Sequence, residues 1–241
     1  MRKLIITLAA VLALFAPAPA KAQATTDLLL VLAVDASGSV NQTRFELQRR
    51  GYADAFANPR VLRAIRSGPM QAIAVAVVQW TGPMMQARII DWTVVEDAAG
   101  AEALSRAIAG APRQLFGGGT SISGAIDYAA RMFAEGNVAG ERRVIDVSGD
   151  GANNSGRPAA SARDAAVRAG IVINGLPILS IEPDLDAFYR DNVVGGPGAI
   201  MRPVADFEHF GEAILDKLIA EIADMPSSGR QRLAHATAPG Q

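Results

Sequence analysis

A run of apolar residues that stops abruptly at a cluster of oxygen-bearing side chains most constrains how this chain folds. The run extends from Leu28 to Val34, and its length and composition are typical of a strand buried on both faces of a sheet. Asp35, Ser37 and Ser39 follow directly, alternating with small residues. In open α/β sheets, ligands bind in the crevice outside the carboxyl ends of the strands, so this cluster lies where a ligand is expected.

The alternation of Asp35, Ser37 and Ser39 allows three side-chain oxygens to converge from a single tight loop. Oxygen ligands without nitrogen or sulfur suit a hard cation such as Mg²⁺. The loop therefore predicts one part of a metal site, and the other ligands must come from elsewhere in the chain.

The rest of the sequence alternates between strand-like and helix-like segments. Further strands are predicted at 73–80, 86–92, 143–147, 171–179 and, at an edge of the sheet, 199–204. Helices are predicted at 42–57, 61–65, 101–109, 122–133, 158–169, 185–192 and 207–222. A short Gly-Pro loop after Trp80 indicates an antiparallel hairpin. The pattern predicts an α/β fold with a doubly wound, mostly parallel central sheet, one antiparallel edge strand and helices on both faces.

The N-terminal segment has the features of a secretory signal peptide. Arg2 and Lys3 precede an apolar stretch at 4–15, and Ala20-Lys21-Ala22 supplies a small-x-small cleavage site. The apolar stretch is too short to span a bilayer comfortably, although an N-terminal anchor or a buried helix is the alternative. We therefore expect a signal peptide at 1–22, one domain at 23–224 and a disordered tail at 225–241. The expected location is periplasmic or secreted, without stable membrane insertion after cleavage.

Charge and cysteine content exclude several classes of function. Loss of Arg2, Lys3 and Lys21 with the signal peptide changes the formal charge from −1 to −4. A mildly acidic domain lacks the broad positive surface that binds nucleic acid or anionic membranes. The chain contains no cysteine, which excludes disulfides, thiolate metal sites, cysteine nucleophiles and a lipidated N-terminal cysteine.

Two distant polar residues complete a recognisable pattern. Thr120 follows three glycines and precedes a predicted helix, and Asp150 follows the predicted strand at 143–147. Asp-x-Ser-x-Ser, a distant Gly-Thr and a final Asp-Gly at a strand end resemble the von Willebrand factor A domain that carries a metal-ion-dependent adhesion site (MIDAS). The resemblance covers 27–223 and is strongest to an uncharacterised family of exported bacterial single-domain versions.

The resemblance implies a metal site and a mode of binding. The implied metal ligands are Asp35, Ser37, Ser39, Thr120 and Asp150. The implied cation is Mg²⁺, with Mn²⁺ or Ca²⁺ as alternatives, and its open coordination position takes an acidic side chain of a partner protein. The implied function is an exported, metal-dependent adhesion or scaffold module without enzymatic activity. Taken singly, each of these residues is also compatible with an ordinary turn or helix cap.

A second family offers an alternative function. Asp35 at a strand end, with a late Gly-Asp-Gly that contains Asp150, is similar to haloacid-dehalogenase-type magnesium-dependent phosphatases and phosphotransferases, in which the first aspartate is the nucleophile. Here Ser37 and Asn154 depart from the residues expected in that family. The predicted mature chain also has a single lysine, Lys217, in the last predicted helix rather than before the late motif.

Histidine-based chemistry finds little support in the sequence. The only histidines are His209, near the last predicted helix, and His235, in the predicted tail. No G-x-S-x-G motif is present, so a serine triad is not indicated. A zinc site or a histidine general base is equally unsupported.

Two further features have alternative interpretations. Asp146 shares a strand face with Asp150 by alternation, and it either orients a metal ligand or forms a buried ion pair with an arginine such as Arg143. Trp80, Met84 and Met85 surround the predicted hairpin turn, where they form either a rim that binds a partner or part of the core.

Overall fold

The computed structural model describes residues 24–223, so the predicted signal peptide and tail lie outside the described residues. Five strands form one sheet: β1 (Ala24–Asp35), β2 (Ile73–Trp80), β3 (Gln86–Val95), β4 (Val138–Gly149) and β5 (Val172–Pro177). The helices are α1 (Gln42–Ala57), α2 (Pro59–Arg66), α3 (Ala98–Gly110), α4 (Ile122–Glu135), α5 (Ala159–Arg168), α6 (Leu185–Asn192) and α7 (Phe210–Ala223).

The sheet has the strand order β3-β2-β1-β4-β5, with β1 at its centre. β1 pairs in parallel with both β2 and β4, and β4 pairs in parallel with β5. β2 and β3 form the predicted antiparallel hairpin at one edge. The predicted doubly wound, mostly parallel sheet with one antiparallel edge strand is therefore confirmed.

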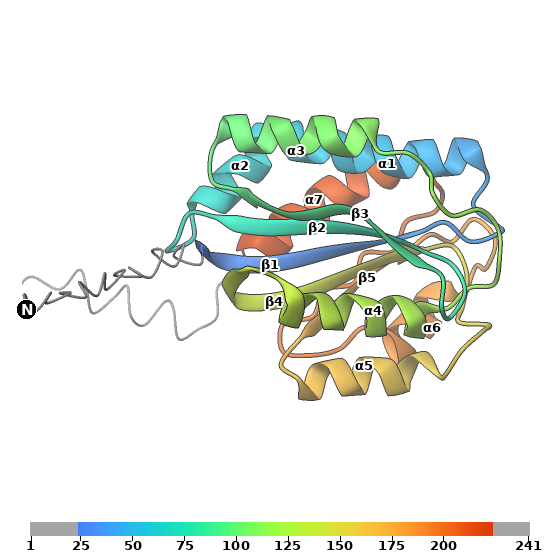
Figure 1. The fold of residues 1–241 in the computed structure, drawn as a ribbon. Coiled ribbons are helices and arrows are strands. Elements are labelled where there is room, and N and C mark those ends of the chain that lie inside the picture. Colours follow the sequence, from blue (N-terminus) through green and yellow to red (C-terminus); the bar gives the residue numbers. More distant parts are fainter. Residues whose placement is uncertain (1–23, 224–241) are drawn as a thin grey trace, which may run out of the picture.

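Two helical layers bury the two faces of the sheet (Figure 1). Leu30 and Leu32 of β1 belong to the core beneath α1, α2, α3 and α7, whereas Val31 and Ala33 belong to the core beneath α4, α5 and α6. Alternate residues of a strand point to opposite faces, so a strand covered on both faces is apolar at every position. This explains the unbroken apolar run that precedes Asp35.

The predicted edge strand at 199–204 is wrong. This segment lies beside β5 but forms only two isolated parallel bridges, Gly175 with Met201 and Ile178 with Val204. Pro177 at the end of β5 has no N–H to donate to this segment, which interrupts the ladder, whereas the N–H groups of Arg202 and Val204 both donate to β5. The segment therefore covers the edge of β5 without becoming a sixth strand.

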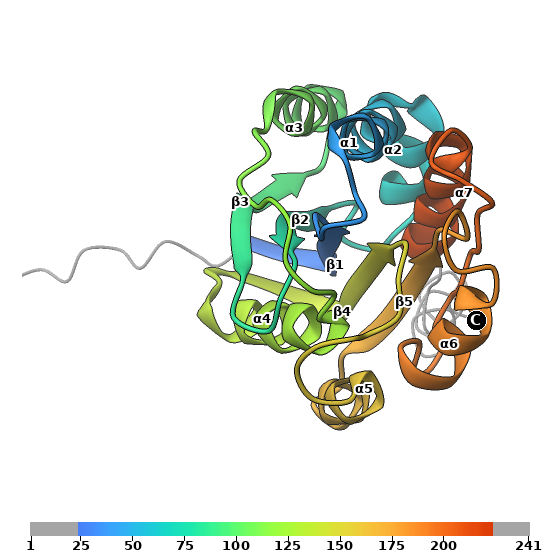
Figure 2. The same cartoon turned by 90° about the vertical axis from the view of Figure 1, so that its right-hand side faces the viewer.

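The carboxyl ends of the parallel strands all face one edge of the molecule. Figure 2 views this edge and shows the loop from β1 to α1 near its centre, between the loop from α3 to α4 and the loop from β4 to α5. The fold therefore brings together the three loops that carry the predicted metal ligands. Within residues 24–223, no helix is both long and apolar enough to cross a membrane.

Candidate metal centre

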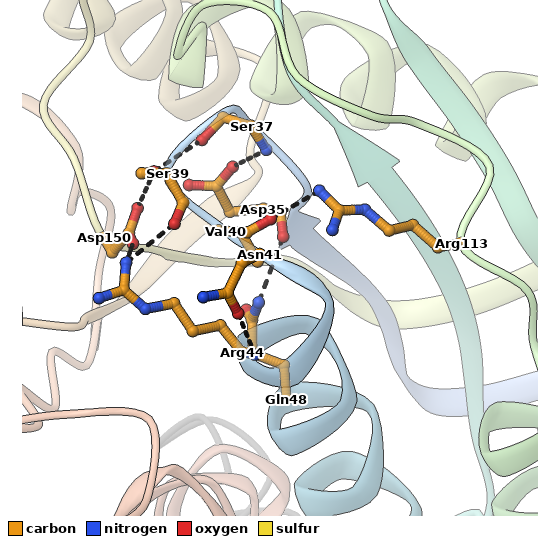
Figure 3. Close-up of polar contacts among 9 residues, drawn as sticks. All are labelled: Asp35, Ser37, Ser39, Val40, Asn41, Arg44, Gln48, Arg113 and Asp150. Atoms are coloured by element: carbon orange, nitrogen blue, oxygen red, sulfur yellow. Dashed lines mark hydrogen bonds and ion pairs between the residues drawn. The ribbon is translucent and has the colours of Figure 1, made fainter.

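The loop after β1 turns its predicted ligands toward one another (Figure 3). Asp35 is completely buried, and its Oδ1 accepts a hydrogen bond of 2.7 Å from the backbone N–H of Ser37. The hydroxyl oxygens of Ser37 and Ser39 lie 3.2 Å apart. The alternating spacing thus places three oxygen-bearing side chains in one small region.

Asp150 reaches the same region from the neighbouring strand. It follows the last residue of β4, and β4 pairs with β1 as far as Val34 and Ser148. The hydroxyl of Ser39 donates a hydrogen bond of 2.5 Å to Oδ1 of Asp150, whose side chain is completely buried. Four of the five predicted ligands therefore form one connected cluster.

Thr120 borders this cluster from a third loop. Its backbone N–H donates to Oδ1 of Asn154 at 2.8 Å, and a Cβ added to Gly151 would lie 3.7 Å from its Oγ1. The backbone N–H of Gly38 donates to the carbonyl of Gly118 at 3.3 Å, which joins the Thr120 loop to the loop after β1. Among the described residues, the Thr120 hydroxyl makes no hydrogen bond to the other four side chains. Its placement is adjacent rather than in contact.

Arg44 is a residue of the site that the sequence analysis missed. Its Nη1 donates to the carbonyl of Ser39 at 2.8 Å and lies 3.4 Å from Oδ2 of Asp150 (Figure 3). Arg44 belongs to the first turn of α1, whose N-cap is Asn41. Long side chains in helices point toward the N-terminus of the helix. The position of Arg44 in the first helical turn could therefore have indicated from the sequence that its side chain reaches back to the preceding loop. A fixed cation therefore lies beside the candidate ligands.

A hydrogen-bonded chain supports the cluster from α1. Nε2 of Gln48 donates to the carbonyl of Asp35 at 3.2 Å. The hydroxyl of Ser148 donates to Oε1 of Gln48 at 3.4 Å, and the hydroxyl of Tyr52 donates to Ser148 at 3.2 Å. Because Gln48, Tyr52 and Ser148 are all buried, this series of hydrogen bonds fixes the end of β1 relative to β4.

Burial makes the two carboxylates costly to ionise without a cation. Burial raises the pKa of Asp35 to about 7, against the effect of the hydrogen bonds from Ser37, and the negative charge of Asp150 adds to the increase. Burial also raises the pKa of Asp150, although Ser39 and Arg44 oppose the shift. The protein alone therefore does not fully compensate the negative charges of the Asp35 and Asp150 carboxylates.

One oxygen of the Asp35 carboxylate lacks a hydrogen-bond partner. Oδ2 of Asp35 is buried and has no hydrogen-bond partner among the described residues. Buried polar atoms are nearly always satisfied, so such an atom calls for a water or an ion. Within residues 24–223, no three His, Cys, Asp or Glu side chains gather into a metal cluster, and the neighbours of Asp35 and Asp150 in this cluster are the hydroxyls of Ser37 and Ser39. Two carboxylates with neighbouring hydroxyls fit a hard divalent cation.

Asp146 does not belong to this cluster. Its side chain is completely buried, and Nζ of Lys217 donates to its Oδ1 at 2.5 Å. Arg143 instead donates to the carbonyl of Ala169 at 2.7 Å. The interpretation of Asp146 as a buried ion-paired carboxylate is therefore supported, with a lysine from α7 in place of an arginine.

The predicted rim residues divide between core and surface. Trp80 is completely buried and packs in the core on the α4 and α5 side of the sheet. Met84 and Met85 are exposed, by 91% and 43%. Trp80 is thus a core residue, and only the two methionines remain available to a partner.

Solved structures with similar coordinates identify the fold of this chain. The chain is similar to proximal thread matrix protein 1 from the mussel byssus, in a structure described as having a zinc-occupied MIDAS motif; the TM-score is 0.58, the identity 15%, and the match covers 82% of this chain and 46% of that one. It is also similar to a von Willebrand factor type A protein from Catenulispora acidiphila, with a TM-score of 0.55, 17% identity and coverage of 82% and 43%. The third comparison is the pilus adhesin SpaC from Lactobacillus rhamnosus GG, with a TM-score of 0.57, 15% identity and coverage of 82% and 30%.

These similarities show that the fold is that of a von Willebrand factor A domain, as the motif predicted. The chain belongs to the family described as "Protein of unknown function (DUF1194)", which it matches over residues 25–226. It spans less than half the length of the three solved structures named here. A comparison with curated proteins finds no match.

Proposed function

We propose that this chain is a metal-dependent protein-binding module. The proposed ligands of the cation are Asp35, Ser37, Ser39, Thr120 and Asp150. The observation that carries the proposal is the buried Oδ2 of Asp35, which has no partner among the described residues although Asp35 belongs to a cluster with two hydroxyls and a second carboxylate. A cation at this position would satisfy that atom and offset the charge of both aspartates.

Mg²⁺ is the cation that best suits this set of ligands. Hydroxyl and carboxylate oxygens are hard donors, and the described site offers neither a thiolate nor an imidazole. Mn²⁺ and Ca²⁺ share this preference for oxygen. The zinc in the mussel protein indicates that a related MIDAS motif also accepts a softer cation, so the titration below includes Zn²⁺.

The proposed role of the cation is to join two proteins. The five groups would hold the cation, and the cation would supply a positive charge that an acidic side chain of a partner could ligate. The pilus adhesin and the matrix protein with the same fold support this role. The predicted signal peptide would direct the protein to the periplasm or the medium, and the proposed function requires no catalytic step.

The phosphotransferase alternative requires a lysine that binds the phosphoryl group, and Lys217 is not in a position to do so. Lys217 is completely buried and held by Asp146 and Glu221, so it does not reach the Asp35 loop. Asp35 is itself buried with one oxygen engaged by Ser37, which does not favour attack on a phosphoryl group.

Isothermal titration of the metal-stripped protein with Mg²⁺, Mn²⁺, Ca²⁺ and Zn²⁺ tests the proposal. We expect saturable binding at one site in the wild type and its loss in folded Asp35→Asn and Thr120→Val variants. Thr93→Val is the matched control, because Thr93 lies on β3 and its hydroxyl donates to the carbonyl of Asp91. Absence of binding in a well-folded wild type would contradict the proposal, and so would retention of full affinity by both site variants.

A further inference from the structure

Large apolar side chains are exposed almost entirely at the edge that carries the candidate metal centre. In the part of the chain that the structure describes, the exposed large hydrophobic residues are Met70, Met84, Met85, Phe116 and Ile181. All but Met70 belong to loops at the carboxyl edge of the sheet. Met70 lies at the opposite edge, where its N–H donates to Asp27 near the start of β1. Exposed apolar side chains gathered in one place mark interaction surfaces.

Two of these side chains are fixed to the loops that surround the site. Phe116 stacks on the guanidinium of Arg113 at 5.0 Å, and Nη2 of Arg113 donates to the carbonyls of Ala36 and Val40 in the loop after β1. A Cβ added to Gly118 would lie 3.8 Å from the Met85 sulfur. Phe116 and Met85 thus flank the Thr120 loop, which contains Gly118 and is joined to the loop after β1 by the hydrogen bond between Gly38 and Gly118.

Ile181 approaches the site from the β5 side. Its neighbour Glu182 accepts a hydrogen bond of 3.1 Å from the N–H of Ala152, and a Cβ added to Gly151 would lie 3.4 Å from Oε1 of Glu182. The same added Cβ would lie 3.7 Å from the Thr120 hydroxyl. Ile181 therefore lies beside the loop that leaves β4, and the apolar side chains occur on two sides of the cluster.

We infer that this edge binds a protein segment in which an acidic side chain is flanked by bulky apolar side chains. The inference rests on the proposed function, since the acidic side chain is the one that reaches the cation. Arg44 contributes a second positive group beside Asp150 and is partly exposed. Around this positive centre, Met84, Met85 and Phe116 offer apolar contacts, and methionine adapts to partners of different shape.

A membrane surface fits the same edge less well. Anionic headgroups require a cluster of available basic side chains, whereas Arg44 and Arg113 at this edge are engaged by Asp150 and by backbone carbonyls. The edge also carries Glu182, and the domain as a whole is mildly acidic. We therefore favour a protein segment, and vesicle binding becomes an outcome of the test.

Selection from a displayed library of random peptides tests the inference without knowledge of the partner. The full chain without its predicted signal peptide is loaded with the cation that the titration identifies, and bound peptides are eluted with a chelator. We expect enrichment of Asp or Glu within one or two positions of Phe, Leu, Ile, Met or Trp. A synthetic peptide of this kind should bind at least about tenfold more tightly than one with serine at the apolar positions.

Surface variants then locate the binding. A Met84→Ser/Phe116→Ser variant should lose the preference for apolar flanks while its metal affinity, which reports on the fold, stays unchanged. Met70→Ser is the matched control and should retain the preference.

Each other outcome overturns a distinct statement. Enrichment of acidic peptides without apolar flanks overturns the inference and leaves the proposed function intact. Enrichment of peptides without acidic residues would overturn both the inference and the proposed function. The complete absence of chelator-sensitive binding would overturn both as well. Metal-dependent sedimentation with phosphatidylglycerol vesicles that the double variant loses would overturn the choice of a protein segment.

Discussion

Lys217 of α7 and Asp146 of β4 form an ion pair of 2.5 Å in which both side chains are completely buried. Glu221, one turn further along α7, also contacts the ammonium group and accepts a hydrogen bond of 2.6 Å from Asn174 of β5. One cation thus serves two buried carboxylates. Burial and the charge of Asp146 raise the pKa of Glu221 to about 7. The two carboxylates outweigh burial at Lys217 and raise its pKa.

The Lys217 cluster should be a large determinant of stability. Lys217→Met leaves two buried carboxylates without a counter-ion, and we expect it to lower the free energy of unfolding by roughly 3–5 kcal/mol. Urea denaturation followed by circular dichroism measures this change. Arg60→Met is the control, because Arg60 pairs with Asp216 of the same helix at an exposed position and should cost less than about 1 kcal/mol. Equal effects of the two substitutions would contradict the prediction.

Arg44 should weaken metal binding in the free protein. Its guanidinium lies 3.4 Å from Oδ2 of Asp150, where it competes with a cation for the same carboxylate. We expect Arg44→Gln to increase the Mg²⁺ affinity by roughly fivefold to tenfold, which corresponds to about 1–1.4 kcal/mol. Isothermal titration measures the affinity, with Arg50→Gln as a control at an exposed position of the same helix. A lower affinity in Arg44→Gln would instead assign Arg44 a supporting role.

Metal binding should release a proton. Burial raises the pKa of Asp35 to about 7, so in the metal-free protein this carboxyl group is mostly protonated near pH 6. A bound cation requires the ionised carboxylate. Titration in buffers of different ionisation enthalpy should report close to one proton released near pH 6 and much less near pH 8. Glu221→Gln, which removes a distant buried carboxyl, should leave this number unchanged. Release independent of pH would contradict the prediction.

The same pKa shift has a consequence for the stability of the metal-free protein. The folded pKa of Asp35 lies above its ordinary value of 3.8, so the folded state binds this proton more tightly than the unfolded state does. The contribution of Asp35 to stability is therefore greatest at low pH and falls as the pH rises from about 4 to about 7. Thermal unfolding of the metal-free protein should show this loss, and a saturating cation should reduce it.

Gly149 leaves no room for a side chain at the end of β4. A Cβ there would lie 2.9 Å from Oδ2 of Asp35 and 3.0 Å from the hydroxyl of Tyr189. We expect Gly149→Ala to lower the melting temperature and to reduce metal affinity by at least about tenfold, because displacement of Asp35 disturbs the proposed ligand. Gly110→Ala is the control, since a Cβ at Gly110 meets no atom within 4 Å. An unperturbed Gly149→Ala site would show that Asp35 can shift without loss of binding.

The fold was predictable because its determinants are local and periodic. The apolar run before Asp35 and the Gly-Pro turn after Trp80 predict a buried strand and a hairpin from sequence alone, and both were found. The segment at 199–204 was misjudged because its apolar composition is typical of a strand, whereas the interruption of the ladder comes from Pro177 on the neighbouring strand. The polar spacing of the loop after β1 also predicted which side chains converge.

The remaining features depend on pairs of residues that lie far apart in the sequence. The partner of Asp146 is Lys217, and only the packing of α7 against the sheet brings them together. The contact between Arg44 and Asp150 likewise depends on the direction of α1 after its N-cap. Trp80 illustrates the same limit, because burial at a strand end depends on the helices that cover it rather than on the strand itself.

The distribution of the candidate ligands over three loops makes the unfolded chain unable to form the site. Metal ions would therefore bind only the folded form and displace the folding equilibrium toward it, by about 2.7 kcal/mol at a free concentration one hundred times the dissociation constant. Chelation and unfolding would then be linked events, and the lifetime of the folded chain against proteases would depend on the divalent cations of its surroundings.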